Sequence, residues 1–499
     1  MLTIKKAFIF AAGNGTRIHR YSSDMPKSLL QIGEESLLIR NIRLLDKSFK
    51  LESITILTGQ FEEKVQVELE KLQKTRCKIL TLNLSPEQIS KGLLTGFAAI
   101  NKFLKPNEIF LSVLADEYYS ELDYTEFSNW LKFQNNFSSV CTYQAFSQPS
   151  EYFKNYSVEL EGSGPIIKRV VEKPKKINSE YFGLGLIATK KSFAVRAAKA
   201  ILNGDKVTLI DLLNVEKDVT GEALLGFQLH GYYKNINTVS DYYSALAFYR
   251  REKQSEFSID IIIPAWNEVD TISYVIHDFL PYSRNVIVMD NLSTDGTAEI
   301  AKKSGAIVFS KKLNGYGDAI KQGLKLSDAD ILVIVEADGT NRAEDLPKLL
   351  SFLINADAVI GTRTYVPYIE NDAHMPFILR IGNIIFGLII TVLWWNRESR
   401  FSDVGCTYRA LWRNSFLKIE SQLSSQGPDF SPEMIVELLN NWQRVIEIPI
   451  PYHARSMGVS KFSKGLSGSA KTGLIMLKII IQKRLVSWIK NSIFSFKKF

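Results

Sequence analysis

Short apolar runs recur through the first half of the chain and alternate with longer stretches of helical periodicity. The runs fall at 7–10, 54–57, 79–82 and 109–114. Runs of this length predict buried strands, and their alternation with helices predicts a largely parallel sheet with helices on both faces. A predicted helix at 242–249 closes this half.

A second alternation begins after a polar stretch at 250–256, which we interpret as a domain boundary. Its predicted strands fall at 259–263, 286–289, 307–309, 331–335 and 359–361. With 499 residues the chain is long enough for two domains of ordinary size. We therefore predict an α/β protein of two Rossmann-like three-layer domains, at 1–250 and 257–470, followed by a basic amphipathic tail at 471–499.

The positive charge of the chain is concentrated at its end. The formal net charge is +8, yet residues 448–499 contain ten Lys and Arg and no acidic residue. Apolar groups at 474–477 and 479–481, followed by Trp488, interleave with these cations at roughly helical spacing. This mixture favours an anionic membrane surface as the partner and argues against nucleic acid. A solvated helix or one packed on the core is the alternative.

A second apolar segment, at 381–395, is too short to span a bilayer. As a helix it would reach about 22 Å, whereas the hydrocarbon core is about 30 Å thick. Trp394 and Trp395 suit the membrane interface, so we expect a re-entrant or surface-lying helix. Because the chain also begins without a signal-peptide pattern, we expect a cytoplasmic protein with reduced cysteines, associated peripherally with the inner face of the membrane.

The first predicted strand runs into a segment of small residues, which let backbone N–H groups approach phosphate oxygens closely. The candidate nucleotide-binding residues are Ala11, Gly13, Asn14, Gly15 and Thr16. Arg17 and Lys27, which follows Pro26, add cations for phosphate oxygens. The segment lacks the third glycine of a dinucleotide-binding turn and the Gly-Lys-Ser/Thr of a P-loop. A glycine turn beside ordinary surface cations is the alternative.

Over residues 4–248 these motifs resemble the sugar-phosphate nucleotidyltransferase family, in which a glycine-rich segment is followed by Pro-Lys. The resemblance implies Arg17 and Lys27 as catalytic residues, Asp116 and Asn235 as Mg²⁺ ligands, and Glu172 and Lys173 as sugar contacts. Many members carry an aspartate where Asn235 stands. The implied reaction joins an NTP to a sugar 1-phosphate and releases pyrophosphate. The form Ala11-Ala12-Gly13 favours UTP, CTP or dTTP as the NTP.

Acidic and amide side chains, and one proline, follow three predicted strands of the second half. These candidates are Pro264, Asn267 and Glu268 after the first strand, Asp290 after the second, and Glu336 and Asp338 after the fourth. The carboxyl ends of parallel strands are where α/β sheets bind ligands, so we expect the first four to bind a nucleotide. Two carboxylates two residues apart beside a diphosphate predict a Mg²⁺ or Mn²⁺ site. Ser293 and Thr294 could instead simply cap a helix.

Over residues 257–470 the chain resembles the inverting family 2 glycosyltransferases of GT-A fold, in particular the polyprenyl-phosphate (dolichol-phosphate) hexosyltransferases. The matching motifs are 336–338, which stands for the metal-binding Asp-x-Asp, and 361–363, 403–409 and 455–461. Glu336 and Thr340 depart from the common pattern. The resemblance implies an NDP-sugar as donor and a polyprenyl phosphate lipid as acceptor.

No general base is evident in the second half. A lipid monophosphate, with a second pKa of about 6, is already largely a dianion near neutral pH and needs only cations to guide it. The candidates for binding this acceptor phosphate are Arg363, Arg409, Arg455 and Lys461. If the acceptor were a hydroxyl, Asp403 would be the catalytic base.

These patterns together predict a bifunctional enzyme that makes an NDP-sugar and transfers the sugar to a membrane lipid phosphate. One alternative makes the first half a cytidylyltransferase for a non-sugar phosphate such as phosphocholine. Another gives the second half a polysaccharide or other hydroxyl acceptor. In a third, suggested by Asn235 and Glu336, one domain is a binding or regulatory module without activity.

Overall fold

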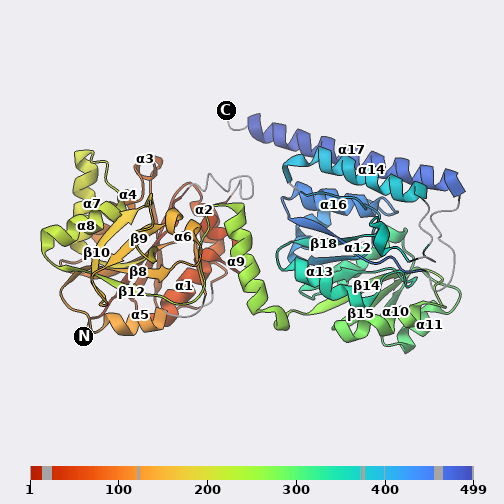
Figure 1. Cartoon of the computed structure of the whole chain (residues 1–499), viewed down its shortest axis with the longest axis horizontal. Helices are drawn as coiled ribbons and strands as arrows, with labels where there is room; N and C mark the ends of the chain where they lie inside the picture. The colour runs from red at the N-terminus through yellow and green to blue at the C-terminus, as the bar shows by residue number, and fades with distance from the viewer. Residues whose placement is uncertain are drawn as a thin grey trace. The chain divides into compact units, whose positions relative to one another are not determined.

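The chain divides into two compact units, Met1–Tyr249 and Arg250–Phe499 (Figure 1). The computed structural model describes residues 2–13, 25–72, 74–120, 124–370, 373, 377–397, 399–454 and 465–496. Each unit has its own central sheet and its own hydrophobic core.

Unit 1 alternates strands and helices in its first half and carries more antiparallel strands in its second. Its strands are β1 (Lys6–Phe10), β2 (Gln31–Ile32), β3 (Glu35–Ser36), β4 (Ser53–Thr58), β5 (Lys78–Asn83), β6 (Ile109–Leu114), β7 (Glu117–Tyr119), β8 (Phe137–Ala145), β9 (Tyr156–Leu160), β10 (Ile167–Glu172), β11 (Tyr181–Lys190), β12 (Ala223–Gln228) and β13 (Tyr233–Asn235). Its helices are α1 (Leu37–Ser48), α2 (Glu62–Leu69), α3 (Pro86–Ser90), α4 (Leu94–Ile100), α5 (Tyr124–Leu131), α6 (Pro149–Lys154), α7 (Lys191–Asn203), α8 (Leu209–Thr220) and α9 (Val239–Glu252), whose last residues belong to unit 2.

A nine-stranded sheet forms the centre of unit 1. Its main path is β10-β9-β11-β6-β1-β4-β5, and β8 pairs with both β11 and β12. Strands β6, β1, β4 and β5 are parallel, whereas β11 runs antiparallel to β6. The carboxyl ends of the parallel strands therefore meet at one edge, where the segments after β1 and β6 carry Gly13 and Asp116.

Both faces of this sheet are covered, as the alternation along β1 requires. Ala7 and Ile9 pack in one hydrophobic cluster with residues of α1 and α5, whereas Phe8 packs in another with residues of α4 and α7. A separate two-stranded sheet pairs β7 with β13 and sets Asn235 opposite Glu117. Residues far apart in sequence thus reach the same edge.

Unit 2 repeats the alternation of strands and helices and contains two long helices, of which the second is its last element. Its strands are β14 (Ile259–Ala265), β15 (Asn285–Asp290), β16 (Ile307–Ser310), β17 (Ile331–Ile334), β18 (Ala358–Thr362), β19 (Arg409–Trp412) and β20 (Val445–Pro449). Its helices are α10 (Ile272–Phe279), α11 (Thr297–Lys303), α12 (Tyr316–Leu326), α13 (Leu346–Leu353), α14 (Phe377–Leu393), α15 (Arg413–Ile419), α16 (Phe430–Asn440) and α17 (Gly465–Phe496).

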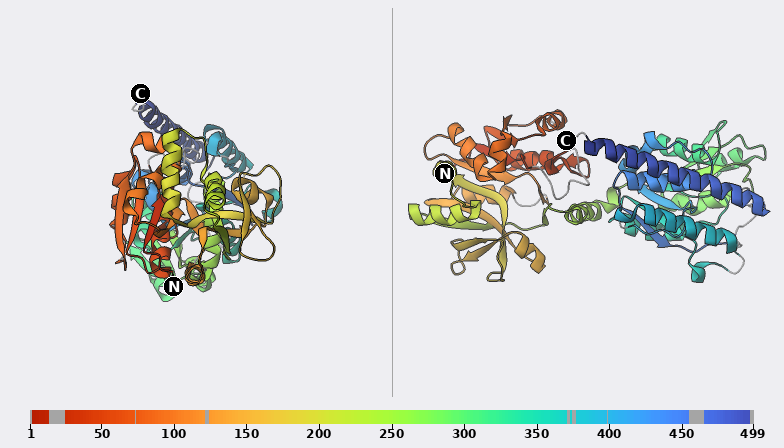
Figure 2. Two further views of the ribbon diagram at one scale, coloured as in Figure 1. Left: turned by 90° about the vertical axis from the view of Figure 1, so that its left-hand side faces the viewer. Right: turned by 90° about the horizontal axis from the view of Figure 1, so that it is seen from above.

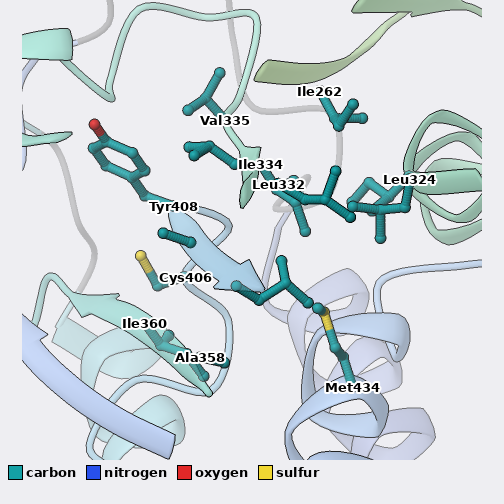
Figure 3. Close-up of a cluster of buried hydrophobic side chains, with 14 of the residues drawn as sticks. Ile262, Leu324, Leu332, Ile334, Val335, Ala358, Ile360, Cys406, Tyr408 and Met434 are labelled. Carbon is teal, nitrogen blue, oxygen red and sulfur yellow. The ribbon is translucent and has the colours of Figure 1, made fainter. Parts of the chain in front are cut away.

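The sheet of unit 2 has the order β16-β15-β14-β17-β19-β18-β20. Strands β16, β15, β14 and β17 are parallel, and β19 runs antiparallel to both of its neighbours. Leu332 of β17 and Ile360 of β18 pack in one core with Leu324 of α12 and Met434 of α16 (Figure 3). This core holds the ends of β14, β15 and β17 in register.

The prediction of two Rossmann-like α/β domains is confirmed by this architecture. Each predicted strand is present within a residue or two of its predicted bounds, and the helix expected at 242–249 is part of α9. The sheets are less parallel than predicted because β11 and β19 are inserted antiparallel beside β6 and β17. The polar stretch at 250–256 is largely helical, and Arg250 is buried in unit 2, where it donates to the carbonyl of Ala356 at 2.8 Å.

The basic C-terminal segment is one continuous helix, α17, that runs along unit 2 (Figure 2). The predicted boundary at 470 falls inside it. Ile479 and Ile480 belong to the core of unit 2, and Lys483 Nζ lies 2.8 Å from carboxylate oxygens of Glu433 and Glu437 on α16. Within the described residues, no helix has both the length and the apolar character that crossing a membrane requires.

Candidate active sites

Lys27 and Asp116 lie together at the strand-end edge of unit 1. Lys27 Nζ is 3.4 Å from Asp116 Oδ2 and donates to Asn237 Oδ1 at 3.1 Å. Asn237 Nδ2 in turn donates to Asn235 Oδ1 at 2.8 Å. The backbone N–H of Ile236 donates to the carbonyl of Asp116 at 3.0 Å, which ties the two segments together. The structure thus brings three of the predicted residues to one place.

Ala11 and Gly13 end the described part of the glycine-containing segment at the same edge. The Ala11 N–H donates to the Leu57 carbonyl at 2.9 Å, which continues the sheet past β1. A Cβ atom built on Gly13 would meet nothing within 4 Å, so the space beside it is open. The predicted residues Asn14, Gly15, Thr16 and Arg17 lie outside the described residues.

Glu172 is the last residue of β10, and Lys173 follows it. Strand β9 lies between β10 and β11 and is antiparallel to both. Glu172 pairs with Tyr156 of β9, and Tyr156 pairs with Gly183 of β11. Burial raises the pKa of the Glu172 carboxyl. The Tyr156 ring occupies the space that a side chain at position 183 would need, since a Cβ there would lie 1.9 Å from it. Gly183 is therefore required for this packing.

In unit 2 the loops after β14 and β15 are joined by hydrogen bonds. The Asn267 N–H donates to Ser293 Oγ, and the Thr294 N–H donates to Asn267 Oδ1, each at 2.9 Å. Asp290 is fully buried and accepts from the Ser293 N–H. The Glu268 N–H donates to the Thr297 hydroxyl at 2.9 Å. Pro264 lies within β14 and Asp290 ends β15, so these two and the predicted nucleotide-binding residues of the following loops share one strand-end edge.

Glu336 and Asp338 follow β17 at this edge. Thr340 donates to Asp338 Oδ1 from its N–H at 3.1 Å and from its hydroxyl at 2.7 Å. The Thr407 hydroxyl donates to Glu336 Oε1 at 2.6 Å. Burial, and then the charge of Asp338, raises the pKa of the Glu336 carboxyl to about 7. Because each carboxylate disfavours ionisation of the other, a cation bound between them would stabilise both in their charged forms.

Arg363 and Asp403 form a bidentate ion pair, and Arg363 is near enough to Glu336 for the two charges to interact. Arg363 Nε lies 2.8 Å from Asp403 Oδ2, and Nη2 lies 3.0 Å from Oδ1. Burial opposes ionisation of Asp403, yet the contacts with Arg363 outweigh it and hold the pKa of Asp403 below its usual value. Asp403 is fully buried and also accepts from the Arg363 and Gly405 N–H groups. This geometry does not support Asp403 as a base, because a base needs a lone pair that the acceptor can reach.

Arg409 has a structural role, which corrects its predicted one. Its side chain is buried and donates to the backbone carbonyls of Cys406 at 2.8 Å, Ser431 at 2.7 Å and Val404 at 3.1 Å. These contacts fix the loop before β19 and occupy donors on all three nitrogens of the Arg409 guanidinium. Arg455 and Lys461, the other two predicted cations, lie outside the described residues.

Two family models match the two units. Residues 6–252 match the nucleotidyl transferase family, and residues 260–409 match glycosyl transferase family 2. The chain belongs to both families. The prediction that it joins a nucleotidyltransferase to a family 2 glycosyltransferase is therefore confirmed.

Relatives of the chain include two sugar transferases that are named for a polyprenyl phosphate. An undecaprenyl-phosphate mannosyltransferase of Micrococcus luteus is 29% identical over 229 residues, which cover 42% of this chain and 89% of that protein. A dolichyl-phosphate hexose transferase of Haloferax volcanii is 28% identical over 237 residues, which cover 46% and 99%. Among solved structures, UDP-glucose pyrophosphorylase in complex with UDP-glucose covers 50% of this chain and 100% of its own, with 18% identity and a TM-score of 0.42.

The glycosyltransferase unit offers the better donor set for a divalent cation. Glu336 and Asp338 supply two carboxylates, which fits an ion whose remaining ligands come from a diphosphate and water. The nucleotidyltransferase unit offers Asp116 and the amide oxygen of Asn235, a weaker pair. Across the described part of the chain, no cluster of three or more His, Cys, Asp or Glu side chains could by itself hold a metal.

The nucleotidyltransferase unit also contains a buried carboxylate that the sequence analysis missed. Glu117 accepts from the hydroxyl of Tyr119, from the hydroxyl of Tyr233 at 2.7 Å and from the Gly185 N–H at 2.9 Å. Burial raises the pKa of its carboxyl to about 7. These contacts hold β7 and β13 against β11. Asp116 directly precedes β7 and Asn235 ends β13, so the same contacts position both residues. No local pattern marks Glu117, because its partners lie up to 116 residues away.

Proposed function

We propose that the nucleotidyltransferase unit makes an NDP-sugar and that the glycosyltransferase unit transfers the sugar to a polyprenyl phosphate at a membrane surface. The observation that carries the lipid-phosphate acceptor is the Arg363–Asp403 pair, whose guanidinium is near enough to Glu336 for the two charges to interact. The pair supplies a cation near Glu336 and at the same time removes Asp403, the candidate base, from use.

In unit 1 an oxygen of the sugar 1-phosphate attacks the α-phosphorus of the NTP, and the bond to the pyrophosphate leaving group breaks. Positioning and charge neutralisation carry such a reaction, because little covalent work falls to the protein. Lys27 would neutralise phosphate oxygens near the reacting centre, and Arg17 the leaving pyrophosphate. Asp116 and Asn235 would hold Mg²⁺, which would neutralise the phosphates. Glu172 and Lys173 would contact the sugar, and UTP, CTP or dTTP would be the NTP.

Pyrophosphate release by the full-length chain tests this assignment. Each of four NTPs is combined with a set of sugar 1-phosphates and, separately, with phosphocholine. We expect Mg²⁺-dependent release with a sugar 1-phosphate, and a loss of at least ~100-fold in Lys27→Ala. Lys47→Ala, at an exposed lysine of α1, is the matched control and should keep full activity. Release with CTP and phosphocholine alone would instead identify a cytidylyltransferase for a non-sugar phosphate.

In unit 2 an acceptor phosphate oxygen attacks the anomeric carbon of the donor sugar, and the bond to the NDP breaks. A phosphate that is largely dianionic near neutral pH brings no proton that must be removed first. Glu336 and Asp338 would hold Mg²⁺ or Mn²⁺, which would neutralise the departing diphosphate. Asn267, Glu268 and Asp290 would bind the nucleotide.

The lipid chain of the acceptor would contact a surface formed by α14 and α17, which pack against each other. Exposed apolar side chains lie on both helices, and on α14 they recur every three or four residues and form one apolar stripe. They include Ile378, Ile381, Ile385, Leu388 and Val392 on α14 and Leu474, Ile481, Leu485 and Ile489 on α17. Neither helix contains an acidic residue, and Lys471 and Lys478 are exposed on α17. We propose that this surface lies on the anionic cytoplasmic leaflet, where NTPs are available.

Vesicles that carry polyprenyl phosphate test the transfer and the surface together. With an NDP-sugar we expect a glycolipid that mild acid cleaves, and no transfer to water-soluble hydroxyl acceptors. Co-sedimentation with anionic vesicles should weaken at high salt without vanishing, because the exposed apolar side chains of α14 and α17 also bind. Leu388→Asp and Ile481→Asp should reduce it, whereas Phe352→Asp, at an exposed apolar residue of α13, should not. Equal transfer to soluble hydroxyls without vesicle binding would refute the lipid acceptor.

A further inference from the structure

Glu336 is held by a hydroxyl from a distant part of the chain. Its Oε1 accepts from Thr407, which is buried in the loop before β19. Its carboxylate also lies within hydrogen-bonding reach of Asp338. A glutamate has one more rotatable bond than an aspartate, so a carboxylate in this position needs a partner to fix its direction.

Thr407 is itself hydrogen-bonded to the hydroxyl of Tyr316, the first residue of α12. A hydroxyl has a single proton to donate. Because Thr407 donates its proton to Glu336, the proton between Tyr316 and Thr407 comes from Tyr316. Burial, and then the charge of Glu336, raises the pKa of Tyr316, so the phenol keeps the proton that it donates.

The glycines on both sides of Tyr316 allow its hydroxyl to reach the hydroxyl of Thr407. Gly315 has a φ of 122°, and a Cβ there would lie 2.8 Å from the carbonyl oxygen of Gln426. A Cβ at Gly317 would lie 2.6 Å from Cβ of Phe430. Glycines on both sides let the start of α12 press against the start of α16. That approach carries the Tyr316 hydroxyl to Thr407.

We propose that Thr407 and Tyr316 are positioning residues that hold one oxygen of Glu336 and leave the other to a divalent cation shared with Asp338. The proposal rests on the cation site proposed above for unit 2. Hydrogen-bond partners of metal ligands change metal affinity by ~10–100-fold when they are removed. We call the hydrogen-bonded series from Tyr316 through Thr407 to Glu336 the relay. Breaking the relay should therefore weaken cation binding more than it destabilises the fold.

Binding of Mn²⁺ alone to the full-length chain tests the proposal, with free Mn²⁺ measured by its electron paramagnetic resonance signal. Every arm carries Asp116→Ala, which removes the carboxylate of unit 1. Thr407→Val should weaken binding by ~10-fold or more, and Thr407→Ser should restore it. Tyr316→Phe should weaken it by a few-fold, because Thr407 can still donate to Glu336. In the transferase assay, excess Mn²⁺ should recover the rate of Thr407→Val.

Two matched substitutions control for the loss of a buried hydroxyl in unit 2. Thr391 accepts from the Phe401 N–H, and the Tyr408 hydroxyl donates to the Arg342 carbonyl, so neither contacts Glu336. Thr391→Val and Tyr408→Phe should leave the affinity for Mn²⁺ unchanged.

The outcomes separate the relay from the cation site itself. If Asp338→Ala abolishes binding while Thr407→Val and Tyr316→Phe bind normally, the relay is wrong and the cation site stands. If Asp338→Ala binds normally, the cation site of unit 2 is wrong. Should Thr407→Val fail to fold, Tyr316→Phe decides, and an unchanged affinity there overturns the relay.

Discussion

The two units build their sites on the same arrangement of strands and differ in the charges that they place there. In unit 1 the order β11-β6-β1-β4-β5 has one antiparallel pairing followed by three parallel pairings, and in unit 2 the order β19-β17-β14-β15-β16 has the same pattern. Asp116 follows β6, and Glu336 and Asp338 follow β17, so the acids occupy corresponding places. The fold therefore determines where a cation would sit, and the side chains determine how strongly it is held.

The side chains at the two edges have different chemistry. Asp116 shares its surroundings with Lys27 and a chain of amides, in which Lys27 donates to Asn237 and Asn237 to Asn235. In unit 2 the paired carboxylates of Glu336 and Asp338 repel each other. Unit 1 thus presents a nearly neutral edge, whereas unit 2 presents an acidic one, which suits the divalent cation proposed above for unit 2.

The largest expected effect comes from removing one acid from each edge in turn. Asp338→Ala should lower glycosyl transfer by at least ~1000-fold and leave pyrophosphate release unchanged, because the cation supplies several kcal/mol of transition-state stabilisation. Asp116→Ala should do the reverse. Both activities are measured on each full-length variant. If either substitution abolished both activities, the two edges would not be independent sites.

A moderate effect is expected from making the edge of unit 1 more like that of unit 2. Asn235→Asp replaces an amide ligand by a carboxylate, so the Mg²⁺ concentration for half-maximal pyrophosphate release should fall, by ~10-fold. A titration of activity with Mg²⁺ measures this, and Asn214→Asp, at the asparagine that bridges β10 and α8, controls for added charge. An unchanged or higher Mg²⁺ requirement would mean that Asn235 is not at the cation.

The smallest effect concerns pH and the buried Glu117. Its folded-state pKa is raised to about 7, so the protonated form is favoured by folding. That contribution to stability is complete below the unfolded pKa of about 4.3 and is lost as the pH rises through about 7. Hydrogen–deuterium exchange of β7 and β13 should therefore quicken between about pH 5 and pH 7 and level off above pH 7, after correction for the intrinsic exchange rate. Glu117→Gln should show less of this change, and an equal change in both would assign it to other groups.

The strand-end placement of Asp116, Asp290 and Asp338 was predictable from sequence, because apolar runs followed by acids mark the carboxyl ends of buried strands. The roles of Asp403 and Arg409 were not. Both are charged residues in a matched motif, and only the structure shows that Asp403 is enclosed by Arg363 and that Arg409 faces backbone carbonyls.

Contacts between distant segments account for what the sequence could not show. Glu117 depends on Tyr233 and Gly185, and Glu336 depends on Thr407, 71 residues away. Similarly, the basic C-terminal segment was predicted as a tail, but Lys483 is paired with Glu433 and Glu437 of α16. A cation within an apolar helix gives no sign in the sequence of which acids will enclose it.

We infer that unit 1 makes the donor that unit 2 uses, and mixing two chains that are each inactivated in one unit tests this coupling. Asp116→Ala and Asp338→Ala chains are incubated separately and together with NTPs, a radiolabelled sugar 1-phosphate and vesicles that carry polyprenyl phosphate. We expect no labelled lipid from either chain alone and labelled lipid from the mixture, because the NDP-sugar made by the Asp338→Ala chain diffuses to the Asp116→Ala chain. Labelled NDP-sugar that accumulates in the mixture without any labelled lipid would contradict it.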